Sequence, residues 1–547
     1  MAAPQSVKGF VHQPEPRMRG SHARGRQLIA GNFRFAGHLI EKPGAGLWEL
    51  TIPDAEFAEA LHGFEWLDDL AAVGDATARK LAQAWVHDWI NRFGIGRGLP
   101  WGPDLVGRRL IRWISHAIFL MNGQSSEQNK RLFISLSVQA KYLARNWASA
   151  PPGLARFEAL IGMLFAGISL DGLGDTVLPV SQALARECES EVDRSGGLST
   201  RNPEELMEVF ILLTWAALAV RDAGHPVLSG HSEALARIAP ALRQIRHADG
   251  GLARFHGGGR GAEGQLDQIL ESHDDGQYVT GTLHMGFARL GLNSSTVIVD
   301  AGAPPAQRSS AQAHASCLAF ELTSARNPVI VNCGSGAMLG PDWRRAGRAT
   351  PSHSTLSIDG VSSARLKAGD AGELLVGGPR RVTAKLEAQE DKTQLFASHD
   401  AYLKTFGLTH VRKIELSERG SLLSGEDTLG ALDERARAVF ESHMDQNALS
   451  GVAFSIRFHL HPDVDPSLDM GGTAISLTLK NREVWVFRSA GAVEMRLDRS
   501  VFLEKGRLKP RPSQQIVLSS RVMEYGARVS WILVKAQAAP TGRRALT

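Results

Sequence analysis

Three pieces of sequence between His314 and Ile358 decide the fold of the second half of this chain: H-A-S-C-L-A-F-E-L, N-P-V-I-V-N-C-G and A-T-P-S-H-S-T-L-S-I. Each piece contains a short run of alternating or β-branched apolar residues, which predicts a strand. His314, Asn332 and His353 stand at the strand ends, where we expect neighbouring strands to bring them together. Two imidazoles and an amide in one place fit a metal or anion site, or a hydrogen-bonded cluster that joins the strands.

The same period-two alternation continues almost to the end of the chain. Many short strands with few helices predict a large antiparallel β-sandwich. The further predicted strands are Thr296–Asp300, Arg381–Glu387, Leu408–Leu416, Val452–Leu460, Ala474–Leu479, Glu483–Phe487, Gln515–Leu518 and Val529–Val534.

Upstream of this region, apolar residues recur at helical spacing from Glu56 to Ile245. Paired amphipathic helices without intervening strands predict an all-α layer, either a toroid or a solenoid. Asn202 followed by Pro203 fits the N-cap and first position of one of these helices, with Glu205 as the acid of a capping box. The chain therefore changes from period 3.6 to period 2, which indicates a multidomain α+β protein.

Composition shifts divide the chain into four predicted parts. A basic arm without an apolar core, expected to be disordered, and a short entry hairpin occupy residues 1–48. The helical domain covers 49–256, a Gly-rich linker covers 257–278, and the β-sandwich covers 279–547.

Bulk composition excludes several protein classes. The chain has 547 residues, 43% hydrophobic and 22% charged, with a formal net charge of +4 and three cysteines. An odd cysteine number implies no disulfide framework. A mild positive charge permits an acidic ligand and gives no reason to expect nucleic acid. Because no signal-peptide h-region and no apolar run of about 18 residues is present, we expect a cytoplasmic protein without a membrane span. The oligomeric state is left open.

Several motifs together resemble the heparinase II/III family of polysaccharide lyases. They are H-A-x-x-L-x-F-E-L, V-N-C-G and R-A-T-x-x-H-S-T-L around the opening stretch, with L-H-G-F-E-W-L-D-D-L, W-G-P-D-L-V-G-R-R-L-I-R-W, G-G-L-S-T-R-N-P, R-H-A-D-G-G-L-A-R-F-H-G and R-F-H-L-H-P elsewhere. The resemblance implies an incomplete (α/α) toroid followed by a β-sandwich, with a substrate cleft between them. Such lyases are usually exported, which makes the cell envelope or periplasm the alternative location.

The resemblance also implies a catalytic set that this chain lacks. β-Elimination at a uronic acid needs a group that neutralises the carboxylate, a base for the C5 proton and an acid for the leaving oxygen. Family members use Asn, Tyr and His for these tasks. Here Leu154, Glu205 and Gln312 stand at those positions, so the catalytic candidates are Glu205, Gln312 and, as the remaining acid–base group, His314.

The family's structural zinc would be held here by His314, Asn332 and His353. Asn332 replaces an aspartate, and an amide is an uncommon zinc ligand. A zinc site and a metal-free hydrogen-bonded cluster are therefore both open.

The candidate substrate-binding residues lie in motif segments that the resemblance places along the cleft. Arginine suits carboxylate recognition and tryptophan suits stacking on a sugar, whereas ion pairs and core packing are the structural alternatives. We expect Arg201 and Arg348 to point into the groove with His314 beneath them. The full set is Trp101, Arg201, Asn202, Asp249, Arg254 and Arg348.

The leading functional hypothesis is a lyase that cleaves an acidic polysaccharide by β-elimination. The alternative is a catalytically degenerate protein with the same architecture that binds a glycan or helps to assemble envelope polysaccharide. A hydrolase using Glu158 or Glu205 is a third hypothesis, for which no second carboxylate is identified.

Overall fold

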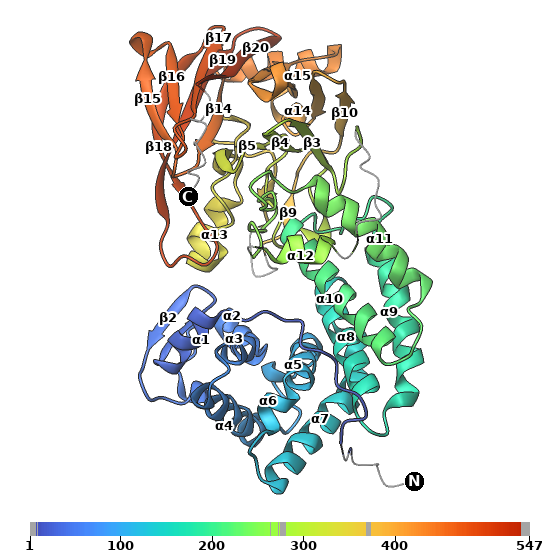
Figure 1. Cartoon of the computed structure of the whole chain (residues 1–547). Coiled ribbons are helices and arrows are strands. Elements are labelled where there is room, and N and C mark those ends of the chain that lie inside the picture. Colours follow the sequence, from blue (N-terminus) through green and yellow to red (C-terminus); the bar gives the residue numbers. More distant parts are fainter. Residues whose placement is uncertain are drawn as a thin grey trace. The chain divides into compact units, whose positions relative to one another are not determined.

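The computed structural model describes residues 7, 9–262, 264–271, 273, 281–367 and 373–537 (Figure 1). Parts of two predicted segments, the N-terminal arm and the 257–278 linker, lie outside the described residues. The chain forms two compact units: Met1–Asp193 with Glu208–Arg237, and Arg194–Met207 with Ile238–Thr547.

The first unit is helical and has the predicted architecture of an incomplete (α/α) toroid (Figure 1, blue to green). The unit boundary passes through α10 (Pro203–Asp222) and α11 (Ser229–Gln244). The other helices are α1 (His22–Ile29), α2 (Ala55–His62), α3 (Glu65–Val73), α4 (Ala76–Phe93), α5 (Pro103–Ser115), α6 (Ala117–Met121), α7 (Ser126–Asn146), α8 (Leu154–Ser169) and α9 (Val177–Glu191).

Local sequence explains where these helices begin and how closely two of them pack. Asp75 caps α4 by accepting a hydrogen bond from the Ala78 amide at 2.7 Å. Helices α5 and α8 touch backbone to backbone, because a Cβ at Gly107 would lie 2.2 Å from the Glu158 carbonyl oxygen and a Cβ at Gly162 would lie 2.4 Å from the Gly107 Cα. Only glycine at both positions permits this approach.

The N-terminal arm is ordered from Gly9 onward, so the expectation of a disordered arm is wrong for these residues. Phe10 packs its ring 5.2 Å from that of Phe133. Arg17 pairs with Asp222 at 3.4 Å. The predicted entry hairpin is present as β1 (Asn32–Phe35) and β2 (His38–Glu41). Apolar and charged contacts with the helices hold the arm, and composition alone did not reveal these long-range partners.

The second unit consists mainly of two antiparallel sheets, as predicted (Figure 1, yellow to red). The first sheet has the order β10-β11-β12-β13-β20-β17-β16-β15, and the second has the order β18-β19-β14-β6-β5-β4-β3, with β7 paired to β14. Their strands are β3 (Phe287–Leu292), β4 (Ser295–Asp300), β5 (Phe320–Ser324), β6 (Asn327–Val331), β7 (Leu356–Ile358), β10 (Val382–Ala388), β11 (Thr393–His399), β12 (Thr409–Ser417), β13 (Leu422–Gly430), β14 (Val452–Leu460), β15 (Asp465–Asp469), β16 (Ala474–Thr478), β17 (Val484–Ala490), β18 (Glu494–Phe502), β19 (Arg511–Val522) and β20 (Gly526–Gln537).

The core of the sandwich lies between the two sheets. Phe320 and Phe458, from the second sheet, place their rings 5.6 Å and 4.9 Å from Trp531 of the first. All three side chains are at most 1% exposed. Alternating apolar residues of both sheets therefore face each other across one continuous core.

Helices are rarer in this region than in the first unit; they include the short helices α12 (Gln265–Glu271), α13 (Pro341–Gly347) and α14 (Leu403–Phe406) and one longer helix. The 13-residue helix α15 (Glu434–Gln446) begins at an Asp433 cap and covers the sandwich with Ala436, Phe440 and Met444. Among the described helices of the whole chain, none combines the length and the hydropathy needed to cross a bilayer.

Candidate functional site

A buried ion pair inside the second unit fixes the first predicted substrate residue, Arg201. Its guanidinium donates to Asp300 Oδ1 at 2.6 Å and to the carbonyl oxygens of Met285, Gly286 and Ala303 at 2.8–3.0 Å. Asp300 is 1% exposed, and the charge of Arg201 outweighs the effect of burial and holds the pKa of this carboxyl well below its usual value. The hydrogen bonds of Arg201 are therefore made within the fold, which gives this side chain a structural role.

Three histidines extend from this pair. His256 Nε2 lies 3.3 Å from Asp300 Oδ2, and its Nδ1 accepts a hydrogen bond from the His314 amide at 3.2 Å. His314 Nδ1 lies 3.0 Å from His353 Nε2, and His353 Nδ1 donates to the Ala349 carbonyl oxygen at 2.8 Å. This bonding assigns the donated proton of the histidine pair to His314 Nδ1. The predicted meeting of His314 and His353 is confirmed.

Burial determines the protonation of this cluster. The His314 ring is 2% exposed and the His353 ring 0%. Burial, reinforced by the charges around it, lowers the pKa of His314 well below the ordinary value, and burial lowers the pKa of His353 to about 4. Both rings are neutral at pH 7 and almost fully buried. The predicted acid–base role of His314 does not fit this placement.

The donors at this point do not fit a zinc ion. Asn332 Oδ1 accepts a hydrogen bond from the Ser354 amide at 3.0 Å, and both ring nitrogens of His353 are hydrogen-bonded within the fold. Two imidazoles remain, whereas structural zinc takes four ligands. Within the described residues, no group of three or more His, Cys, Asp or Glu side chains is arranged to hold a metal ion. The arrangement is that of the hydrogen-bonded cluster, with Asn332 bound beside it.

Two more predicted substrate residues are buried in the fold. Arg348 is 1% exposed and donates to the carbonyl oxygens of Ala313 and Ser310 at 2.8 Å and 2.9 Å. Trp101 is 3% exposed and donates its indole N–H to the Phe93 carbonyl oxygen at 2.7 Å. Neither the guanidinium nor the ring offers a surface to a sugar, so the prediction that Arg348 and Trp101 contact substrate is not met by this structure.

Gln312 and Asn202 lie near the Gly257–Gly259 turn of the second unit. Asn202 caps α10 as predicted, accepting from the Glu204 and Glu205 amides at 3.0 Å and 3.3 Å. A Cβ at Gly257 would lie 3.1 Å from that of Gln312, so this exposed amide side chain sits against the same turn. Gln312 has no titratable group, and Glu205 is half-buried.

In the first unit, Glu158, the hydrolase candidate, is bound by Arg108 at 2.8 Å. Burial raises its pKa to about 7 despite this charge. Because the carboxylate is 7% exposed on the α5–α8 contact, its role is structural.

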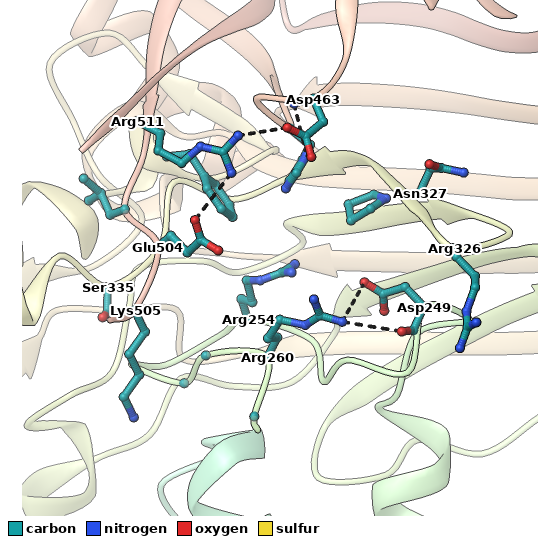
Figure 2. A pocket seen from close by; sticks show the side chains of 18 of the residues that line it. Asp249, Arg254, Arg260, Arg326, Asn327, Ser335, Asp463, Glu504, Lys505 and Arg511 are labelled. Carbon is teal, nitrogen blue, oxygen red and sulfur yellow. Dashed lines mark hydrogen bonds and ion pairs between the residues drawn. The ribbon is translucent and has the colours of Figure 1, made fainter. Parts of the chain in front are cut away.

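The last two predicted residues, Asp249 and Arg254, line a pocket of about 640 Å³ in the second unit (Figure 2). Arg260 lies 3.7 Å from Asp249, and Arg511 binds Asp463 and Glu504 at 2.9 Å and 3.4 Å. Arg326, Lys480 and Lys505 complete the charged lining. Sequence reasoning missed these residues because they sit in separate hairpins, and a charged residue after a strand is normally a solvated loop residue.

Comparisons with known proteins agree with this architecture. The model of the heparinase II/III-like C-terminal domain matches residues 276–532. FtsZ-localized protein C of Caulobacter vibrioides (strain NA1000 / CB15N) is 30% identical over 549 residues, which cover 98% of this chain and 91% of that protein.

Two solved structures show the same fold at low identity. A crystal structure of heparinase III matches with a TM-score of 0.72 and 12% identity, covering 97% of this chain and 88% of that one. A mutant heparan sulfate lyase from Pedobacter heparinus matches with a TM-score of 0.61 and 16% identity, covering 96% and 85%. The family model, the full-length relative and the fold lead to one conclusion: this chain belongs to the heparinase II/III family.

Proposed function

We propose that this chain is a non-catalytic member of the family that binds an acidic polysaccharide and localises with FtsZ. The observation that carries the first part is the state of the family's three catalytic positions. Leu154 cannot neutralise a carboxylate, and Gln312 cannot exchange a proton at neutral pH. Glu205, at the tyrosine position, adds a negative charge near a uronate carboxylate that Leu154 leaves unneutralised, which opposes elimination.

The buried histidines do not replace the missing groups. A general acid or base must come within hydrogen-bonding distance of the proton that it transfers. His314 and His353 are almost fully buried, and their pKa values are lowered, His353 to about 4. They support the strands around them. This cluster therefore provides no accessible histidine that could act as the acid or base of an elimination.

The second part of the proposal is supported by the relative from Caulobacter. That protein is named for its localisation with FtsZ, and the alignment covers nearly all of both chains. A protein with a lyase architecture that binds a polysaccharide without cleaving it would bring that polysaccharide to the place where FtsZ is located.

The test has two arms. Incubating the chain with a panel of uronate polymers should give no unsaturated product absorbing in the near ultraviolet, while a heparinase III control does so on heparan sulfate. Binding to at least one polymer should be measurable by affinity electrophoresis. Turnover on any polymer contradicts the non-catalytic assignment, and binding to none contradicts the glycan-binding one.

The localisation arm uses a fluorescent fusion expressed in the source cells together with labelled FtsZ. Coincident bands, and co-sedimentation of the purified chain with FtsZ polymers from the same organism, are expected. A uniform distribution of the fusion would refute this part of the proposal.

A further inference from the structure

The pocket of the second unit contains an arginine whose hydrogen-bonding capacity is unused. The Arg254 side chain is 11% exposed, and its guanidinium reaches Glu321 only at 3.8 Å. Among the described residues, no acceptor lies within hydrogen-bonding distance of its five N–H donors. In Figure 2 it extends between Glu504 and Asp249 and is joined to neither. Because Arg254 lines the pocket, a ligand that enters the pocket can supply acceptors for these N–H donors.

Glu321 fixes Arg254 in this position without satisfying it. Glu321 Oε2 already accepts hydrogen bonds from His247 Nε2 at 3.1 Å and from the Arg254 amide at 3.0 Å. Against the effect of burial, these bonds and the charge of Arg254 keep the pKa of Glu321 below its usual value. The carboxylate therefore stays ionised beneath the guanidinium and holds it in place. The Phe502 ring also contacts Arg254, with its centre 5.7 Å from the guanidinium carbon Cζ.

The rim of the pocket mixes cations with carboxylates. Six arginine and lysine side chains line it against three Asp and Glu side chains. Glu321 and Glu204 pair with Arg254 and Lys505 from outside the lining, which leaves an excess of one positive charge. His461 adds none at neutral pH, because burial lowers its pKa to about 4. The pocket therefore attracts an anion through its cations, and its carboxylates can accept hydrogen bonds from hydroxyl groups.

This pattern discriminates between classes of anion. Polyphosphates and densely sulfated sugars would bring several negative charges close to Asp249, Asp463 and Glu504, which repel them. A sugar with one carboxylate and free hydroxyls has a better match: the carboxylate pairs with Arg254, and the hydroxyls donate to the rim carboxylates. A volume of about 640 Å³ lies within the usual range for small-ligand sites.

We infer that this pocket binds the carboxylate of an unsulfated acidic saccharide, with Arg254 as its principal contact. The site lies wholly within the second unit and involves none of the three positions that the resemblance assigns to catalysis. The inference rests on the proposed function for the saccharide nature of the ligand, and on the geometry of Arg254 for the site.

The test is isothermal titration calorimetry of the full chain with galacturonate as the probe, and with galactose, inorganic sulfate and inorganic phosphate for comparison. Galacturonate should bind and neutral galactose should bind at least about tenfold more weakly, because a charge-assisted hydrogen bond is lost. Arg254→Gln should weaken galacturonate binding about ten- to hundredfold. The matched control, Arg435→Gln on the exposed face of α15, should leave binding unchanged.

A second variant guards against misfolding of the first. Arg326 is exposed, lines the pocket and has no ion-pair partner among the described residues, so Arg326→Gln should fold normally and weaken binding about two- to threefold. Equal affinity of Arg254→Gln and wild type, or no galacturonate binding by the wild type, overturns the site. Sulfate or phosphate bound as tightly as galacturonate, with the same dependence on Arg254, overturns the saccharide assignment.

Binding of polygalacturonate to wild type and variants separates this inference from the proposed function. If the polymer binds both wild type and Arg254→Gln equally, the pocket is refuted and glycan binding stands. If the wild type cleaves the polymer, the non-catalytic function is refuted and the Arg254→Gln result alone decides the pocket.

Discussion

Arg201 and Arg254 belong to the same unit and both lie next to a buried carboxylate, yet their surroundings differ. Arg201 makes hydrogen bonds with Asp300 and three carbonyl oxygens. Arg254 has a single loose ion pair at 3.8 Å. A guanidinium that uses four of its five N–H donors within the fold stabilises the fold, whereas one that uses none retains capacity for a ligand. The number of N–H donors that have no acceptor within the fold therefore indicates a ligand-binding arginine better than the residue type does.

The largest expected effect comes from removing the saturated arginine. Arg201→Gln should lower the free energy of unfolding by about 3–5 kcal/mol, because Asp300 is left buried without its partner. Arg254→Gln should cost only about 1–2 kcal/mol, since one loose contact is lost. Urea denaturation followed by circular dichroism measures both. Equal losses would show that the two arginines have the same structural weight.

The histidine cluster next to Arg201 predicts loss of stability in weak acid. The folded-state pKa of His353 is about 4, below the ordinary 6.5, so the unfolded chain takes up a proton that the folded chain refuses. Stability is then lost as pH falls from about 6.5 to 4, with a contribution on the order of 3 kcal/mol from this ring.

His353→Gln should make the decline of unfolding free energy between pH 7 and 4.5 shallower than in wild type. Asp300 acts in a separate window, because its depressed pKa makes a contribution that is lost only below the unfolded value of 3.8. An unchanged slope between pH 7 and 4.5 would argue that His353 does not resist protonation.

The rim of the pocket should matter less than its floor. Lys480 is 67% exposed and pairs with Asp463 at 2.7 Å. Exposed pairs of this kind contribute little, so Lys480→Gln should weaken galacturonate binding no more than about twofold and change stability by less than about 1 kcal/mol. Calorimetry beside Arg254→Gln makes the comparison, and an equal effect of the two variants would remove the special position of Arg254.

Zinc should have no effect at all on the buried cluster. An ion bound at a hundred times its Kd would stabilise the fold by about 2.7 kcal/mol. Because both ring nitrogens of His353 are already hydrogen-bonded and no carboxylate or thiolate joins the two histidines among the described residues, we expect the same thermal midpoint with added zinc, with EDTA and without either. A zinc-dependent rise that disappears in His314→Gln would restore the metal site.

The sequence-based prediction of the fold rested on the period of the apolar residues and on helix-capping residues. The strand predicted at Val452–Leu460 is β14 with the same ends, and the helix start at Asn202 and Pro203 is the start of α10. These features depend on neighbours in the chain, which the sequence contains in full. The β-sandwich and the helical unit followed from them.

Strand β13 was not predicted from the sequence. Its inward positions include Gly425 and Asp427, which have no apolar signature. Gly425 makes room for Trp531, since a Cβ there would lie 2.0 Å from the indole, and Asp427 is bound by Arg412 at 2.7 Å. A small residue and a buried ion pair fill the core here, and both depend on partners that only the fold supplies.

The sequence by itself determined the two architectures, the missing catalytic groups at Leu154, Glu205 and Gln312, and the meeting of His314 with His353. Tertiary structure alone decided which arginines are spent on the fold and which remain open to a ligand. Arg201 finds Asp300 across 99 residues, and Arg254 faces a lining drawn from several separate hairpins. Burial and hydrogen-bond saturation arise from such distant contacts, which a local pattern of residues does not encode.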